Sequence, residues 1–184
     1  NGHVALASPA VIFGGGLGIM QSSTIITLLI LIALAYVGFN FAKIKGSIGE
    51  KRVIKALKKL DKEDYLVLND IMVRTDRGTS QIDHIVLSRF GVFVIETKTY
   101  TGWIHGSEDA DYWTQTVYRN KQKFRNPIKQ NYGHIAALKE TMPEFRDIPY
   151  HSIIVFAGDA ELKNVNVKAE VVYVDCLYDT IMRY

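Results

Sequence analysis

The distribution of charge constrains this chain more than any other feature. All 41 charged side chains, 22 Lys and Arg with 19 Asp and Glu, lie from Lys43 onward, and residues 1–42 carry none. The remaining 142 of the 184 residues are therefore about 29% charged, slightly above the roughly 25% of soluble domains. Such a chain combines an apolar leader with one domain of ordinary size.

Residues 22–42 are expected to form a transmembrane helix. From 24 to 42, 15 of 19 residues are hydrophobic, and 21 helical residues span about 31 Å, close to the roughly 30 Å of a hydrocarbon core. Lys43 and Lys45 follow this run, and basic flanks stay on the cytoplasmic side. We therefore expect a single-pass protein of the cell membrane whose domain faces the cytoplasm. A buried core helix is the alternative.

Residues 1–21 are an uncharged, glycine-rich leader whose role the sequence leaves open. A re-entrant segment, a short second span and a flexible outer tail all fit this composition. Elsewhere the composition excludes intrinsic disorder, collagen and coiled coil. The single cysteine, Cys176, excludes an internal disulfide framework and a multi-cysteine zinc site.

Hydrophobic periodicity and turn signals divide residues 43–184 into helices and strands. After a polar junction at 43–47, we expect helices over 48–60, over 126–142 and from 175 onward, the last cut short at the chain end. Strands are expected at 65–73, 81–87, 92–98, 103–105, 112–118, 153–156 and 170–174. This order indicates a mixed α/β domain around a central sheet.

Two acids and a lysine lie on two strands that are expected to pair. Side chains alternate along a strand, so Glu96 and Lys98 share a face. A two-residue turn at 89–90 places Asp83 opposite Glu96, and like charges placed in this way repel. A hard divalent cation relieves that repulsion, since Mg²⁺ binds through one or two carboxylates. Taken singly, each charge also fits an ordinary solvated surface.

Glu50 supplies a further carboxylate from the 48–60 helix. Its spacing from Val53 and Leu57 places it on or beside the apolar face, where an unpaired charge is costly. We expect Asp83, Glu96 and Lys98 to converge near Glu50.

At these residues the chain resembles a known family. Asp83 with Glu96 and Lys98 resembles the PD-(D/E)XK signature of the restriction-endonuclease-like superfamily, and the surrounding sequence resembles the nuclease-related domain (NERD) family. The matching stretches lie at residues 46–50, 81–86, 91–98, 102–104, 113 and 126–131. The resemblance covers about residues 46–157.

The resemblance implies an α-β-β-β-α-β core with a mixed central sheet, and a role in DNA processing. The implied site consists of Glu50, Asp83, Glu96, Lys98 and Gln130. The implied chemistry is phosphodiester hydrolysis, in which Asp83, Glu96 and Glu50 hold Mg²⁺ or Mn²⁺, and Lys98 orients water or stabilises charge. Gln130 contacts substrate or supports the site, although a solvent-exposed residue is an equal alternative.

A basic segment suggests a path for the substrate. Five basic residues and no acid occupy 11 positions, interleaved with aromatic residues: Arg119, Lys121, Lys123, Arg125 and Lys129. Such groups bind backbone phosphates. Anionic lipid and plain solvent are the alternatives.

We therefore expect a membrane-anchored, metal-dependent deoxyribonuclease with DNA and membrane lipid as partners and no small-molecule cofactor. The alternatives are a non-catalytic nucleic-acid-binding module on the same fold and a membrane assembly module whose leader forms a homo-oligomer.

Overall fold

The computed structural model describes residues 22–184. The described chain divides into two units between residues 40 and 41, and the unit from residue 41 onward holds the sheets and the candidate site. The elements in chain order are α1 (Ser22–Leu57), β1 (Tyr65–Thr75), β2 (Gly78–Ser88), β3 (Gly91–Lys98), β4 (Gly102–Ser107), β5 (Tyr112–Val117), β6 (Asn120–Arg125), α2 (Pro127–Thr141), η1 (Pro143–Phe145), β7 (Tyr150–Phe156), β8 (Ala160–Asn166), β9 (Glu170–Tyr173), η2 (Val174–Cys176) and α3 (Leu177–Met182).

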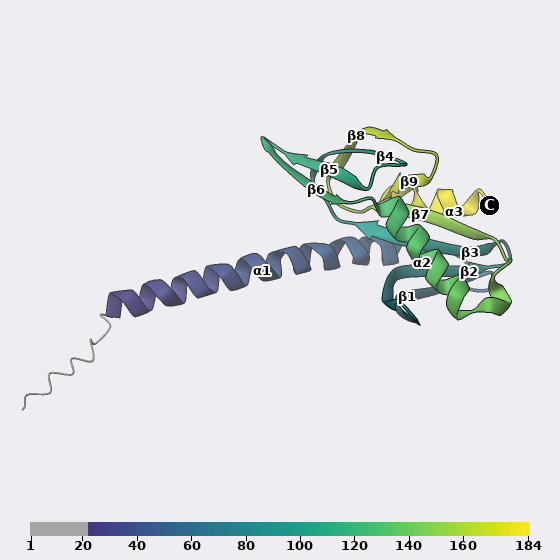
Figure 1. The fold of residues 1–184 in the computed structure, drawn as a ribbon, viewed down its shortest axis with the longest axis horizontal. Coiled ribbons are helices and arrows are strands. Elements are labelled where there is room, and N and C mark those ends of the chain that lie inside the picture. Colours follow the sequence, from purple (N-terminus) through teal and green to yellow (C-terminus); the bar gives the residue numbers. More distant parts are fainter. Residues whose placement is uncertain (1–21) are drawn as a thin grey trace, which may run out of the picture. The chain divides into compact units, whose positions relative to one another are not determined.

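The central sheet has five strands in the order β1-β2-β3-β7-β9 (Figure 1). β1, β2 and β3 pair antiparallel, whereas β3, β7 and β9 run parallel. The chain between β3 and β7 contains α2, which gives the long crossover that parallel neighbours need. The mixed α/β fold around a mixed central sheet, expected from the sequence, is confirmed.

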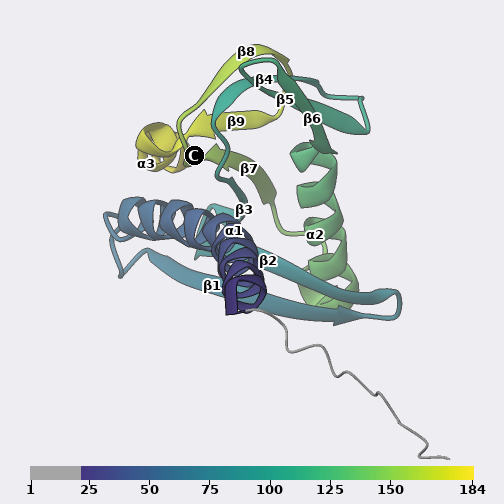
Figure 2. The same ribbon diagram turned by 90° about the vertical axis from the view of Figure 1, so that its left-hand side faces the viewer.

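The two faces of the central sheet pack against different helices (Figure 2). On one face, Phe93 and Ile95 of β3 pack with Val53 of α1. On the other face, Val94 packs with Leu138 of α2. Because side chains alternate along a strand, odd-numbered residues of β3 face α1 and even-numbered residues face α2.

A second sheet has four strands in the order β6-β5-β4-β8. β4, β5 and β6 pair antiparallel, and β8 pairs parallel to β4. Its inner face carries Ile104 and Trp113, which are buried together with Ile128 of α2 and Phe156 of β7. α2 therefore packs against both sheets.

Asn126 fixes the start of α2. Its side chain accepts a hydrogen bond from the backbone N–H of Ile128 at 2.9 Å, as an N-cap residue does. Its amide nitrogen donates to the backbone oxygens of Ser107, Glu108 and Ala110. One buried side chain thus joins the helix start to the β4–β5 connection, which agrees with the helix start expected at this residue.

The structure differs from the expected elements in three places. The polar junction at 43–47 lies inside α1, because Gly46 alone costs about 1 kcal/mol of helix propensity and does not break a helix. Residues 120–125, for which we expect no strand, form strand β6. β8 was not expected at all.

The segment 22–42, for which we expect a membrane span, belongs to α1. Within the part of the chain that the structure describes, no helix is both long enough and apolar enough to cross a membrane. The leader at residues 1–21 lies outside the described residues.

Candidate functional site

The candidate site lies where β2 and β3 separate. Their pairing runs from Ser88 with Gly91 to His84 with Ile95, which is the register expected from the two-residue turn. At the next position, Asp83 Oδ2 accepts the backbone N–H of Thr97 at 2.8 Å. If the pairing of β2 with β3 continued, the N–H of Thr97 would donate to a backbone carbonyl of β2. Here it donates to the side chain of Asp83 instead.

Glu96 and Lys98 lie beside this opening and contact each other. Lys98 Nζ donates to Glu96 Oε1 at 2.6 Å and to Gln130 Oε1 at 3.0 Å. Glu96 is 3% exposed. Gln130 is on α2, so this helix and the even-numbered face of β3 together hold the lysine. Gln130 is half-buried and accepts a hydrogen bond from Lys98, so it is not the solvent-exposed residue that the sequence also allowed.

His134 is a member of this cluster that sequence reasoning did not assign to the site. Its Nε2 lies 3.1 Å from Glu96 Oε2, and its Nδ1 lies 2.7 Å from Ser80 Oγ. Because the carboxylate can only accept, Nε2 carries the proton toward Glu96, and Nδ1 of the neutral ring accepts from Ser80. The available signal was its four-residue spacing from Gln130, which places both side chains on one side of α2.

Glu50 borders the same hollow but comes from the opposite side of the sheet. The hollow has a volume of about 350 Å³, and Glu50, Asp83, Glu96 and Lys98 line it. The four residues expected to converge thus line one hollow, and Glu96 also contacts His134 of α2. Parity accounts for the contact with His134, since even-numbered residues of β3 face α2.

Asp83, which is half-buried, and Glu96, which is buried, have opposite pKa shifts. Burial and the charge of Glu96 raise the pKa of Asp83 from 3.8 to about 6, and Glu50 adds to this rise. Burial also raises the pKa of Glu96, but the hydrogen bond from His134 and the ammonium of Lys98 outweigh it and hold that pKa below its usual value. Glu96 is therefore the member of the pair that loses its proton at the lower pH.

The donor set at the hollow fits a hard divalent cation with few protein ligands. Asp83 and Glu96 supply carboxylate oxygens, and Mg²⁺ is commonly held by one or two carboxylates with water and phosphate. Burial and then the charge of Glu96 raise the pKa of Asp83, and a cation between the two carboxylates would offset the second of these causes. Among the described residues, however, no group of three or more His, Cys, Asp or Glu side chains is arranged to hold a metal.

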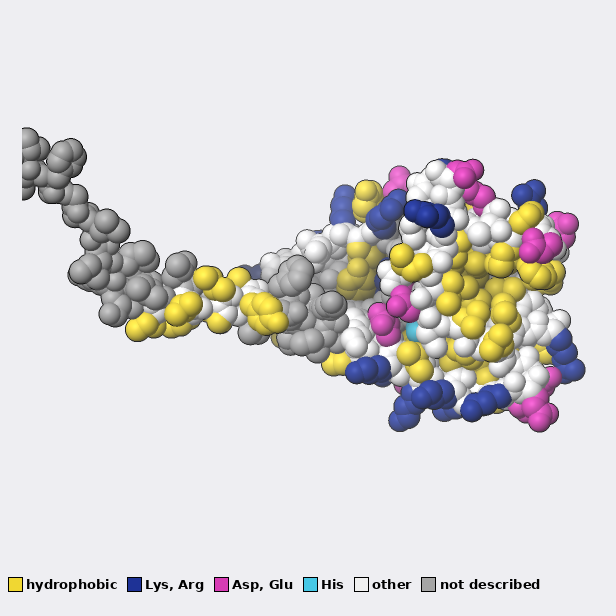
Figure 3. All heavy atoms as spheres, turned by 90° about the horizontal axis from the view of Figure 1, so that it is seen from below, with side chains coloured by type: hydrophobic (Ala, Val, Ile, Leu, Met, Phe, Trp, Pro, Cys, Tyr) yellow, Lys and Arg dark blue, Asp and Glu magenta, His cyan; other side chains and the backbone are white. Residues whose placement is uncertain are grey.

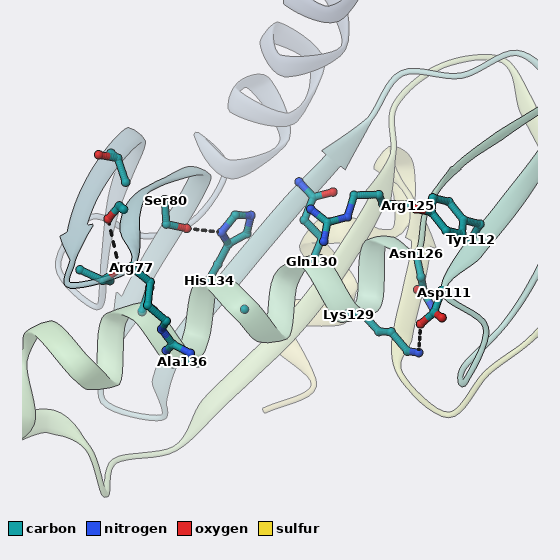
Figure 4. A pocket seen from close by; sticks show the side chains of 15 residues that line it. Arg77, Ser80, Asp111, Tyr112, Arg125, Asn126, Lys129, Gln130, His134 and Ala136 are labelled. Carbon is teal, nitrogen blue, oxygen red and sulfur yellow. Dashed lines mark hydrogen bonds and ion pairs between the residues drawn. The ribbon is translucent and has the colours of Figure 1, made fainter.

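A groove of about 570 Å³ adjoins the site along α2 (Figure 4). Gln130 and His134 line this groove and also contact Lys98 and Glu96. These two side chains therefore separate the groove from the hollow that holds the acids. Arg125 also lines the groove and extends from β6 in the direction of Gln130 (Figure 4).

The basic residues expected to bind nucleic acid are exposed but do not form one loop. Lys121, Lys123 and Arg125 alternate with other residues along β6, and Arg119 lies in the β5–β6 turn. Lys129 is on α2, lines the groove and pairs with Asp111 at 2.7 Å. Figure 3 shows acidic side chains and a histidine together near the middle of one face, with Lys and Arg side chains along a margin.

A known protein family and a curated protein match this chain. The model of the nuclease-related domain family matches residues 45–157. The chain is also similar to an uncharacterized protein of Bacillus anthracis, at 45% identity over 146 residues, which cover 77% of this chain and 68% of the relative.

Among solved structures, a match is found to the crystal structure of a protein of unknown function, AF1548. The two share 9% identity and a TM-score of 0.36 over 73% of this chain, and this chain spans about half, 54%, of that one. At this level of similarity the match carries no argument.

Proposed function

This chain belongs to the nuclease-related domain family, and on that premise we propose that it is a metal-dependent nuclease that hydrolyses DNA phosphodiester bonds. One observation supports the proposal most strongly. Asp83, Glu96 and Lys98 line one hollow at the point where β2 and β3 separate. Two acids and an amine that share a hollow beside a groove can hold a phosphate group and its attacking water.

In this proposal Asp83 and Glu96 hold Mg²⁺ or Mn²⁺, with Glu50 at the border of the hollow. The ion supplies Lewis acidity toward the phosphoryl oxygen and lowers the pKa of water. The two carboxylates suit this role because a cation between them offsets their mutual repulsion, which already contributes to the raised pKa of Asp83.

Lys98 is the group we propose to act on the reacting atoms. Its ammonium is held by Glu96 and Gln130, so its position is set before substrate binds. A fixed positive charge in a partly buried site stabilises the negative charge that develops on phosphoryl oxygens. Gln130 has a further role here, since it lines the groove and can contact the substrate on that side.

The test is cleavage of plasmid DNA by the purified chain with Mg²⁺ or Mn²⁺. We expect Asp83→Ala and Glu96→Ala each to reduce cleavage by about 100-fold or more. Glu144→Ala, which removes an exposed acid on η1, is the matched control and should cleave like the wild type. Mn²⁺ should also raise the thermal transition of the wild type and not that of Asp83→Ala, because an ion that binds only the folded site stabilises it.

Cleavage that persists in both acid variants contradicts this site. No cleavage by the wild type favours the alternative, a non-catalytic nucleic-acid-binding module or a membrane assembly module on the same fold. One observation favours that alternative: within residues 22–184, three or more metal-binding side chains are not brought together. Binding of DNA without turnover distinguishes it from the nuclease.

Attachment to the cytoplasmic face of a cell membrane is a separate proposal that rests on the sequence. It is supported by the uncharged run at 22–42 and by the basic residues that follow it. Co-sedimentation of the full chain with lipid vesicles tests it, and an Ile30→Arg variant should lose sedimentation. Chemical cross-linking in the same vesicles tests whether the chain forms a homo-oligomer.

A further inference from the structure

The outer face of the second sheet carries aromatic and basic side chains in one register. Trp103 of β4 lies opposite Thr116 of β5, which lies opposite Lys121 of β6. Further along β5 and β6, Tyr112 of β5 lies opposite Arg125 of β6. Directly opposed residues point to the same face, so the aromatic residues share this face with the basic side chains of β6.

Both aromatic side chains on this face are open to solvent. Trp103 is 51% exposed and Tyr112 is 57% exposed, whereas Trp113, on the inner face of the same sheet, is 0% exposed. Lys163 of β8 lies over the Trp103 ring, with Nζ 5.5 Å from its centroid. Large aromatic rings beside cations, left uncovered among the described residues, are characteristic of surfaces that bind a ligand.

This face continues the groove that adjoins the acids. Tyr112 and Arg125 line the groove, and Lys123 and Lys121 follow Arg125 on the same side of β6. At about 3.3 Å per residue, the distance from Arg125 to Lys121 is about 13 Å. A chain of phosphates that leaves the groove at Arg125 therefore meets two more lysines and then the Trp103 ring.

We propose that the outer face of β4, β5 and β6 binds an unpaired nucleic-acid strand, with bases stacked on Trp103 and Tyr112 and phosphates on Lys121, Lys123 and Arg125. The proposal rests on the proposed nuclease function and adds a substrate class, nucleic acid with a single-stranded segment next to the site. Aromatic platforms along a basic surface bind single strands because every base has a face that can stack. In a duplex those faces are already stacked inside the helix.

Fluorescence of the two tryptophans tests this surface without turnover. The full chain carrying Asp83→Asn is titrated in EDTA with a 15-nucleotide thymidine strand, and with an abasic strand of the same length and charge. We expect the thymidine strand to quench tryptophan fluorescence, because Trp103 is exposed and Trp113 is buried. The abasic strand should bind more weakly and quench little.

Substitutions separate stacking from charge. Trp103→Ala should weaken thymidine binding about tenfold and abolish quenching, whereas Trp103→Phe keeps a ring and most of the affinity. Lys121→Ala with Lys123→Ala should reduce the slope of log affinity against log salt by about 1.4, at about 0.7 per phosphate. Phe145→Ala, which removes an exposed ring on η1, is the control and should bind like the parent.

Equal affinity for the thymidine and abasic strands, or unchanged binding by Trp103→Ala, overturns the proposal. Quenching by phosphatidylserine vesicles but not by the thymidine strand assigns the surface to lipid instead and also overturns it. Failure of the nuclease proposal is measured in a different experiment, the cleavage assay. A wild type that cleaves no DNA can still show binding that depends on Trp103.

Discussion

The carboxyl group of Asp83 links the stability of the fold to pH. Its pKa rises from 3.8 to about 6 through burial and the charge of Glu96, so the folded state binds this proton more tightly than the unfolded chain. The contribution of Asp83 to the free energy of unfolding therefore falls as pH rises from about 4 to about 6. A pKa raised by about two units corresponds to a loss of about 3 kcal/mol.

We predict that Asp83→Asn in EDTA raises the free energy of unfolding by about 1–3 kcal/mol at pH 8 and leaves it unchanged at pH 3.5. The amide keeps an oxygen that can accept the N–H of Thr97, so the loss of charge is the main change. Urea denaturation at the two pH values measures it. An equal gain at both values would show that the charge of Asp83 is not the cause.

His134 is the second residue whose removal has a defined cost. It donates to Glu96 and shares a hydrogen bond with Ser80, and a buried carboxylate that loses a donor becomes less stable. We predict that His134→Ala lowers the free energy of unfolding by about 1–3 kcal/mol, and that the same substitution costs less in a Glu96→Gln background. A double-mutant cycle by chemical denaturation measures this coupling. If the two costs simply add, the contact does not stabilise the fold.

At the scale of elements, α1 packs closely against the end of β3 because a glycine lies at the contact. A Cβ added at Gly49 would collide with the side chain of Thr99, which follows β3, whereas a Cβ at Gly46 on the same helix meets open space. Replacement of glycine by alanine otherwise favours a helix by about 1 kcal/mol, so the two positions separate packing from propensity.

We predict that Gly49→Ala destabilises the fold by about 1–3 kcal/mol through overpacking, while Gly46→Ala stabilises it by up to about 1 kcal/mol. Thermal unfolding of both variants measures the contrast. Gly49→Ala combined with Thr99→Gly should recover part of the loss. A loss of the same size at both glycines would contradict a steric cause.

Local periodicity was sufficient to predict the core of the site. The turn and the alternation along β2 and β3 predict Asp83 beside Glu96 and Lys98, because parity in a hairpin follows from the turn alone, and the three residues do line one hollow. The contacts of His134 could not be predicted in this way, since they depend on how α2 packs over β3.

Strand β6 shows why other elements escaped prediction. Its residues alternate lysine or arginine with Asn120, Gln122 and Phe124, and this composition resembles a loop. β6 is an edge strand of the second sheet, and edge strands commonly carry lysine because charge prevents pairing with other chains. Only the pairing with β5, a tertiary fact, distinguishes such a strand from a basic loop.

At the scale of the whole molecule, both sheets contribute to one groove through α2. Residues of the β1–β2 turn, including Arg77, line one part, and Arg125 of β6 lines another. Because α2 packs against both sheets and Asn126 ties its start to the β4–β5 connection, the walls of the groove have a fixed spacing.

We predict that DNA binding in EDTA depends steeply on salt and that Arg125→Ala reduces the slope for duplex DNA by about 0.9, the value for one phosphate contact. Arg146→Ala, which removes an exposed cation just after η1, should leave the slope unchanged. Fluorescence anisotropy between 50 and 200 mM salt, a range over which phosphate contacts weaken strongly, measures both. Equal slopes for the two variants would show that Arg125 does not contact a DNA phosphate.

The hydrogen bond between Thr97 and Asp83 has a spectroscopic consequence. The Thr97 amide proton is held by a carboxylate at 2.8 Å, in a strand whose neighbouring amides bond to carbonyls. Its nuclear magnetic resonance frequency should therefore follow the ionisation of Asp83, with a midpoint near pH 6 in the absence of metal. Addition of Mn²⁺ should broaden the same resonance if Asp83 is a ligand. A single backbone proton thus reports on both the charge and the occupancy of the site.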